Sequence, residues 1–115
     1  MRRFAVLLVP LALAASPAAA ADGAKLFALQ CKSCHAAKSS PMGPAVTGVA
    51  GARVAGRTDY KYSAGLAAKG GTWTDAALDA YLAKPTTFAP GTRMTYAVPV
   101  AENRTAIVGY LKTLK

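Results

Sequence analysis

The sequence predicts an all-α fold of three to five helices joined by long loops. Apolar residues recur at helical spacing in several separate stretches, and the alternating pattern of a β-strand is absent from the sequence. Between these stretches, glycine and proline interrupt the segments 36–61 and 85–100 too often for regular structure. Loops of this length in a small domain usually have a function or pack against another group.

The first 21 residues are predicted to be a cleaved signal peptide rather than part of the fold. The chain begins with the basic Met1-Arg2-Arg3, continues with an apolar stretch to Ala15, and then has small residues and one proline up to Ala21. The apolar stretch is short for a membrane-spanning helix, which takes about 20 residues, and a retained anchor is the alternative. We therefore expect cleavage just before Ala21 or Asp22, one domain over residues 22–115, and a periplasmic protein without a membrane anchor.

Four stretches are predicted to be helical, because each combines apolar residues at helical spacing with residues that begin or end helices. They are 23–34, 62–68, 75–84 and 101–114. Asp22 and Thr74 are expected to cap the first and third helices. Pro85 should end the third helix, because the residue before a proline disfavours helical geometry.

The stretch Cys31-Lys32-Ser33-Cys34-His35 has the spacing of a site of covalent haem attachment. Each thiol can add to one vinyl group of a porphyrin, and the histidine that follows is then delivered to the iron. The chain has no other cysteine or histidine. In the predicted first helix, Phe27, Cys31 and Cys34 share one face.

Three other uses of the cysteine pair fit the sequence less well. A thioredoxin-like dithiol has its first cysteine at a helix start, whereas here a predicted helix runs into the pair. A zinc site takes four ligands, and the chain offers a single Cys-Cys-His cluster. A disulfide across two residues closes too short a loop to add much stability. The motif therefore predicts one covalently attached haem c, which contains iron.

Two further positions have alternative interpretations. Pro44 follows His35 closely enough for its carbonyl oxygen to accept a hydrogen bond from the imidazole, which would orient the ring; a simple turn is the alternative. Tyr81 is either an ordinary core residue or one whose hydroxyl reaches the metal ligand opposite His35.

The net charge of the chain is +9, or +7 once Arg2 and Arg3 are removed with the signal peptide. A strongly basic domain can bind nucleic acid, an anionic membrane or an acidic protein. The basic residues are dispersed along the chain, and no nucleic-acid-binding motif accompanies them. We therefore expect acidic faces of partner proteins, and no nucleic acid, as the contacts.

With its motifs in this order, the chain resembles class I c-type cytochromes of the mitochondrial-like and short bacterial soluble kinds. The matching stretches are Gly23…Phe27…Cys31-Lys32-Ser33-Cys34-His35, Gly43-Pro44, Gly71-Thr72-Trp73, Tyr81-Leu82…Pro85, Pro90-Gly91-Thr92-Arg93-Met94 and Ile107…Tyr110-Leu111-Lys112. The resemblance implies the cytochrome c fold, in which helices and long loops wrap around one covalent haem. It also implies that the first helix crosses the last, with Gly23 and Phe27 against Ile107 and Tyr110.

The resemblance implies that His35 and Met94 are the axial ligands of the haem iron. Met42, the other methionine outside the signal peptide, lies only seven residues from His35 and close to Pro44. Met94 lies in a distant loop that can reach the opposite face of the haem.

The resemblance also implies donors that satisfy the buried haem propionates: Tyr62, Trp73, Thr92 and one arginine. Arg53 is favoured over Arg57 for the arginine, although the family usually has arginine directly after glycine and this chain reads Gly51-Ala52-Arg53. A buried carboxylate requires such donors.

Ligation by histidine and methionine fills both axial positions of the iron, so the resemblance implies a one-electron carrier and not an enzyme. The expected partners are a quinol–cytochrome c oxidoreductase and a terminal oxidase or reaction centre, which a monomeric carrier would contact through the haem edge. Candidate rim charges are Lys32, Lys38, Lys61 and Arg93. The alternative is a dedicated electron-acceptor subunit of a periplasmic dehydrogenase, or a haem enzyme or sensor with a labile sixth ligand.

Overall fold

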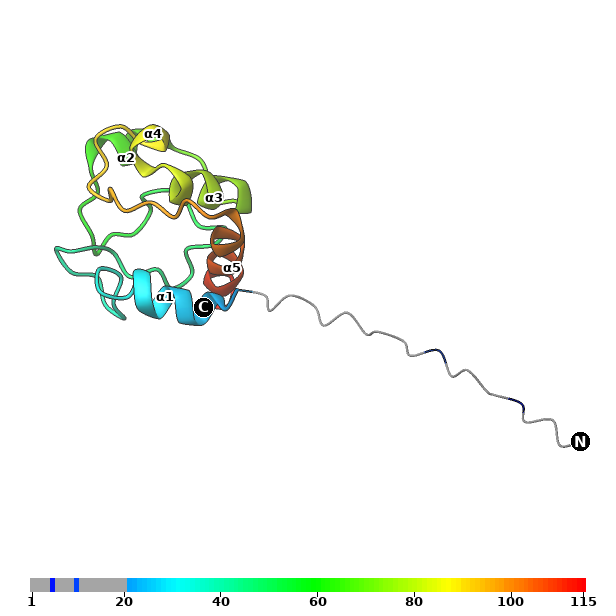
Figure 1. Ribbon diagram of the computed structural model, residues 1–115. Helices are drawn as coiled ribbons and strands as arrows, with labels where there is room; N and C mark the ends of the chain where they lie inside the picture. Colours follow the sequence, from blue (N-terminus) through cyan, green and yellow to red (C-terminus); the bar gives the residue numbers. More distant parts are fainter. Residues whose placement is uncertain (1–4, 6–9, 11–20) are drawn as a thin grey trace, which may run out of the picture.

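The computed structural model describes Ala5, Pro10 and residues 21–115 (Figure 1). The helices of this part are α1 (Gly23–Gln30), α2 (Ala64–Lys69), α3 (Asp75–Ala83), α4 (Pro85–Phe88) and α5 (Ala101–Leu111). Among the described residues there is no strand. The β-type pairing in this part consists of two isolated bridges, Ser40 with Gly43 and Arg53 with Thr72. The prediction of an all-α fold with long loops is confirmed.

The predicted signal peptide, residues 1–21, lies outside the described residues except for Ala5, Pro10 and Ala21. Within the described part, every helix is too short or too polar to cross a membrane.

Helices α1 and α5 cross at a point where a glycine lets their backbones touch (Figure 1). A Cβ atom at Gly23 would collide with the carbonyl oxygen of Ala106 and would lie 2.7 Å from its carbonyl carbon. One turn further along α1, the ring of Phe27 packs against Tyr110 with the ring centroids 5.2 Å apart. Ile107 is almost fully buried beside them. The predicted crossing of the first and last helices is confirmed.

Helix α3 packs against α5 and completes this side of the core. Thr74 caps α3 as predicted, because its Oγ1 accepts a hydrogen bond from the N–H of Ala77 at 3.1 Å. The apolar stripe of α3 faces inward, and its buried residues are Leu78, Tyr81 and Leu82. Two ion pairs join the outer faces of the two helices: Arg104 to Asp79 at 2.8 Å and Lys112 to Asp75 at 3.0 Å.

The predicted ends of three helices need correction. Helix α1 ends at Gln30 rather than near Cys34, because Cys34 and His35 both donate their N–H groups to the Cys31 carbonyl and form a tight turn. Helix α2 begins at Ala64 because Ser63 caps it, its Oγ accepting from the N–H of Leu66. Helix α5 ends at Leu111 and gives way to turns.

Helix α4 lies in a segment that the sequence predicted to be irregular. Pro85 ends α3, as expected, but it also occupies the first position of α4. Proline fits that position because its missing N–H is one that the first turn of a helix leaves without an intrahelical partner.

Candidate haem site

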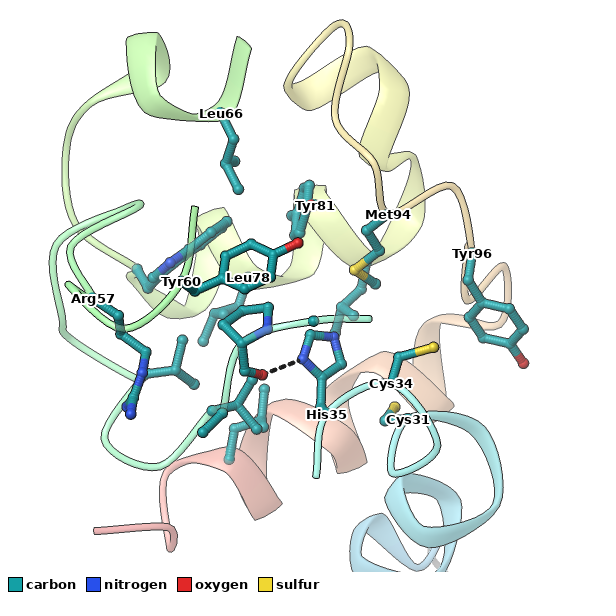
Figure 2. A pocket seen from close by; sticks show the side chains of 18 of the residues that line it. Cys31, Cys34, His35, Arg57, Tyr60, Leu66, Leu78, Tyr81, Met94 and Tyr96 are labelled. Carbon is teal, nitrogen blue, oxygen red and sulfur yellow. Dashed lines mark hydrogen bonds between the residues drawn. The ribbon is translucent and has the colours of Figure 1, made fainter. Parts of the chain in front are cut away.

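A cavity of about 730 Å³ lies between the turn after α1, the loop before α2, helix α3 and the segment around Met94 (Figure 2). Its volume is within the roughly 300–1,000 Å³ typical of ligand and cofactor sites. All ten residues that the sequence indicated as cofactor-binding line this one cavity. They are Cys31, Cys34, His35, Pro44, Arg53, Tyr62, Trp73, Tyr81, Thr92 and Met94.

The tight turn after α1 presents the cysteine pair to the cavity. The N–H groups of Cys34 and His35 lie 3.2 and 2.9 Å from the carbonyl oxygen of Cys31, so the turn fixes the spacing of all three side chains. Both thiols are free and partly buried. Burial raises the pKa of the Cys31 thiol, and the nearby Cys34 adds to the effect. In Figure 2 the two sulfur atoms lie beside the His35 ring.

The imidazole of His35 is held in one tautomer by the loop that follows it. Its Nδ1 lies 2.8 Å from the carbonyl oxygen of Pro44, which is the contact expected from the sequence (Figure 2). Because a carbonyl only accepts hydrogen bonds, Nδ1 must carry the proton and donate it. Nε2 is then left with its lone pair free to bind a metal.

Gly43 allows this close approach. A Cβ atom there would lie 2.7 Å from the Cys34 carbonyl oxygen and 3.4 Å from the His35 ring.

Met94 enters the cavity from the segment between α4 and α5 and points toward His35 (Figure 2). Its side chain is partly buried and packs against the hydrophobic core. Met42 also touches the cavity, but 69% of its surface is exposed to solvent.

Tyr81 and Thr92 are bonded to each other at the buried wall of the cavity. The Tyr81 hydroxyl lies 2.7 Å from Thr92 Oγ1. Burial raises the pKa of Tyr81, although its hydrogen bond with Thr92 opposes the shift. The ring of Tyr81 also packs against Trp73, with centroids 5.1 Å apart. The structure therefore places the Tyr81 hydroxyl on a threonine, where the sequence allowed either a plain core position or a contact with the metal ligand.

The two candidate arginines differ in their contacts. Arg57 makes two hydrogen bonds of 2.9 Å to the carboxylate of Asp59 and a longer one, 3.3 Å, to the Thr47 carbonyl. The bond from Arg57 holds the pKa of Asp59 below its usual value. The side chain of Arg53 makes no hydrogen bond to any described residue, although it lines the same cavity. Of these two arginines, Arg53 is therefore the one whose guanidinium has no hydrogen-bond partner among the described residues.

Tyr60 is a cavity residue that sequence reasoning missed. It lines the cavity (Figure 2). Its ring meets that of Tyr62 edge to face, with centroids 5.0 Å apart. Burial raises the pKa of Tyr62. The only sequence feature that could have indicated Tyr60 is its spacing of two from Tyr62. In an irregular loop, such a spacing does not predict that two side chains face the same way.

Of the four basic residues expected at the rim, only Arg93 lines the cavity. Its Nη1 donates to the main-chain carbonyl of Lys61 at 2.7 Å. Lys32, Lys38 and Lys61 are exposed, and they are not among the residues that line the cavity.

The residues present fit a covalent haem. Two free thiols, an imidazole with a free Nε2 and a thioether converge on one cavity, and arginine, tyrosine and tryptophan donors border the same space. Thiols form the covalent links of haem c, and imidazole and thioether are the ligand pair that holds iron in cytochromes c.

Residues 20–115 match the model of the family Cytochrome c. A cytochrome c homolog from Rickettsia bellii is 41% identical over 97 residues, which are 81% of this chain and 56% of that protein. Cytochrome c of Tetrahymena pyriformis is 36% identical, with 83% of this chain and 88% of that protein covered. This chain spans about half the length of several bacterial relatives that it matches.

The solved structure of cytochrome cH from Methylobacterium extorquens has the same fold. It superposes with a TM-score of 0.72 at 36% sequence identity and covers 81% of this chain and 99% of its own. The family match, the relatives and this structural likeness imply one covalently bound c-type haem with iron as the cofactor. With the fold and the cavity in agreement, the chain belongs to the cytochrome c family.

Proposed function

We propose that this protein is a one-electron carrier whose haem is joined to Cys31 and Cys34 and ligated by His35 and Met94. The observation that supports this most strongly is the convergence of an imidazole and a thioether on one cavity beside two free thiols. A haem bound in this way supplies a ferric/ferrous couple that takes up and releases one electron.

The axial residues favour electron transfer over substrate chemistry. The hydrogen bond from His35 Nδ1 to the Pro44 carbonyl orients the imidazole and increases the basicity of Nε2. A thioether is a soft ligand that favours the reduced iron and so raises the reduction potential. His35 and Met94 would together hold the iron through two side chains of the protein and so would leave substrates no free coordination site.

The polar groups around the cavity are proposed to hold the haem propionates. Arg53 is the favoured guanidinium, because Arg57 is already engaged with Asp59. Tyr62, Trp73 and Thr92 are the remaining proposed donors, and Tyr81 orients the Thr92 hydroxyl through their 2.7 Å hydrogen bond. These donors would offset the cost of burying a carboxylate.

The proposed carrier acts in the periplasm as a monomer, after removal of residues 1–21. Its charge of +7 without Arg2 and Arg3 supports contacts with acidic faces of membrane redox complexes. The proposed donor is a quinol–cytochrome c oxidoreductase, and the acceptor is a terminal oxidase or reaction centre. Lys32, Lys38, Lys61 and Arg93 are the proposed contact charges.

The dependence of electron-transfer rate on salt tests this function. At about 0.1 M salt, charges more than roughly 10 Å apart are screened, so the rate of reduction by a quinol-oxidising membrane complex should fall steeply as salt rises. Lys32→Gln and Lys61→Gln should each slow the reaction at low salt. Lys112→Gln is the matched control, because Lys112 pairs with Asp75 in the groove between α3 and α5.

Two results would contradict the proposal. A rate that does not change between low and moderate salt would exclude steering by acidic partners. Rapid binding of cyanide to the ferric wild-type haem would show an open sixth position, and would favour the enzyme or sensor alternative.

A further inference from the structure

Met94 lies in a segment whose main chain is hydrogen-bonded only at its two ends. The N–H of Thr92 donates to the Ala89 carbonyl at 2.9 Å, and the N–H of Val98 donates to the Leu82 carbonyl at 2.8 Å. Among the described residues, no hydrogen bond involves the N–H groups of residues 93–97. We call residues 93–97 the Met94 segment.

The two ends of the Met94 segment are firmly held. Thr92 is buried and bonded through its hydroxyl to Tyr81. Val98 is 2% exposed, and its carbonyl accepts a 3.0 Å hydrogen bond from Arg104 Nη1. The segment is therefore a short flap with fixed ends, and its position depends on side-chain contacts.

Besides the contacts of Met94 with the core, two side chains of the Met94 segment form hydrogen bonds to separate parts of the protein. On one side of Met94, Arg93 donates to the Lys61 carbonyl, in the loop that precedes α2. On the other side, the Tyr96 hydroxyl donates to Gln30 Oε1 at 3.2 Å. Figure 2 shows Met94 pointing toward His35, and Tyr96 further along the same segment.

Gln30 is the last residue of α1 and directly precedes Cys31. The Tyr96–Gln30 bond therefore ties the segment that carries Met94 to the turn that carries the two cysteines and His35, the other proposed axial ligand. Tyr96 is 52% exposed, so burial holds its ring only in part. Removing the hydroxyl or its acceptor should loosen the segment without removing core contacts.

We propose that Tyr96 and Gln30 form a latch that holds the Met94 segment closed and so positions the Met94 thioether. This inference rests on the proposed ligation by Met94. With the latch broken, the segment swings away from the cavity more often, and an added ligand enters the sixth position faster. Loss of one such exposed hydrogen bond corresponds to roughly a two- to tenfold increase in that rate.

The rate of imidazole binding to the ferric holoprotein, followed by stopped-flow absorbance, tests the latch. Tyr96→Phe removes the donor and Gln30→Ala removes the acceptor, whereas Gln30→Glu keeps an acceptor oxygen. Tyr110→Phe is the matched control, because Tyr110 packs on Phe27 and its hydroxyl makes no hydrogen bond to a described residue. The free energy of unfolding and the weak long-wavelength absorption band of a ferric iron–thioether bond are recorded for each variant.

The latch predicts that Tyr96→Phe and Gln30→Ala each raise the binding rate about two- to tenfold, and that the double variant raises it no further. Gln30→Glu and Tyr110→Phe should keep the wild-type rate. The thioether band and the free energy of unfolding should stay close to wild type throughout, because resting ligation and core packing are intact.

Unchanged rates in Tyr96→Phe and Gln30→Ala, or additive effects in the double variant, would overturn the latch. A separate control, Met94→Ala, distinguishes failure of the latch from failure of the proposed ligation by Met94. If Met94→Ala removes the thioether band while the latch variants bind imidazole at the wild-type rate, only the latch is wrong. If Met94→Ala keeps the band, the ligation by Met94 is wrong.

Discussion

Replacing Gly23 with alanine should separate the crossing helices α1 and α5. The added Cβ would collide with the Ala106 carbonyl oxygen and would lie 3.0 Å from Tyr110 Cβ. Overpacking a well-packed core typically costs about 1–3 kcal/mol. The atoms in the way belong mainly to the helix backbone, which cannot rotate aside, so we expect about 2–3 kcal/mol of destabilisation.

Gly109 on α5 is the matched control for the same chemical change. A Cβ atom there would meet no heavy atom within 4 Å, and the position is exposed. Glycine inside a helix is roughly 0.5–1 kcal/mol less favourable than alanine. Gly109→Ala should therefore stabilise the protein by about that amount.

Thermal unfolding of the holoprotein, followed by circular dichroism, compares the two variants. For a domain of this size, each 1 kcal/mol shifts the melting temperature by about 4–8 °C. Gly23→Ala should melt roughly 10–20 °C below wild type, and Gly109→Ala roughly 2–8 °C above it. A Gly23→Ala protein that melts at or above the wild-type temperature would refute the packing derived for this crossing.

Other predictions concern haem attachment, pH and the histidine support. Cys31→Ala combined with Cys34→Ala should leave no haem on the polypeptide after denaturing electrophoresis; peroxidase staining of the band would contradict covalent attachment. Because burial raises the pKa of Tyr81, the folded state keeps its proton longer than the unfolded state, and stability should fall as pH rises above about 10. Tyr81→Phe should lessen that fall in denaturant midpoints. Gly43→Ala should displace the Pro44 carbonyl, make His35 Nε2 a less basic ligand and so raise the reduction potential relative to Gly109→Ala, measured by redox titration.

Helices with strong local patterns were predictable from the sequence. Thr74, the apolar stripe of α3 and Pro85 together located that helix within one residue at its C-terminal end. The short α4 was missed because Pro85 both ends α3 and begins α4. A proline after a helical stretch was interpreted only as the end of that helix. The end of α1 was placed too late because the turn at Cys31 keeps near-helical spacing after the helix ends at Gln30.

In the site, the attachment motif is contiguous and could be read directly, and the resemblance indicated Arg53, Tyr62, Trp73, Thr92 and Met94. The contacts that sequence reasoning missed join side chains in irregular loops. Gln30 and Tyr96 are 66 positions apart, and neither lies in a pattern that predicts the other. Arg57 and Asp59 are close in the sequence. Only the loop conformation, however, shows that Arg57, and not Arg53, is paired with this carboxylate.

The most direct test of the account is a comparison of Met94→Ala with Met42→Ala in the ferric holoprotein, by absorption spectrum and reduction potential. Met94→Ala should keep the covalent haem, lose the thioether band, shift toward a high-spin or exchangeable form and have a lower potential, because the soft sulfur favours reduced iron. Met42→Ala, at an exposed position, should do none of these. A low-spin Met94→Ala protein with an unaltered potential would contradict the electron-carrier mechanism.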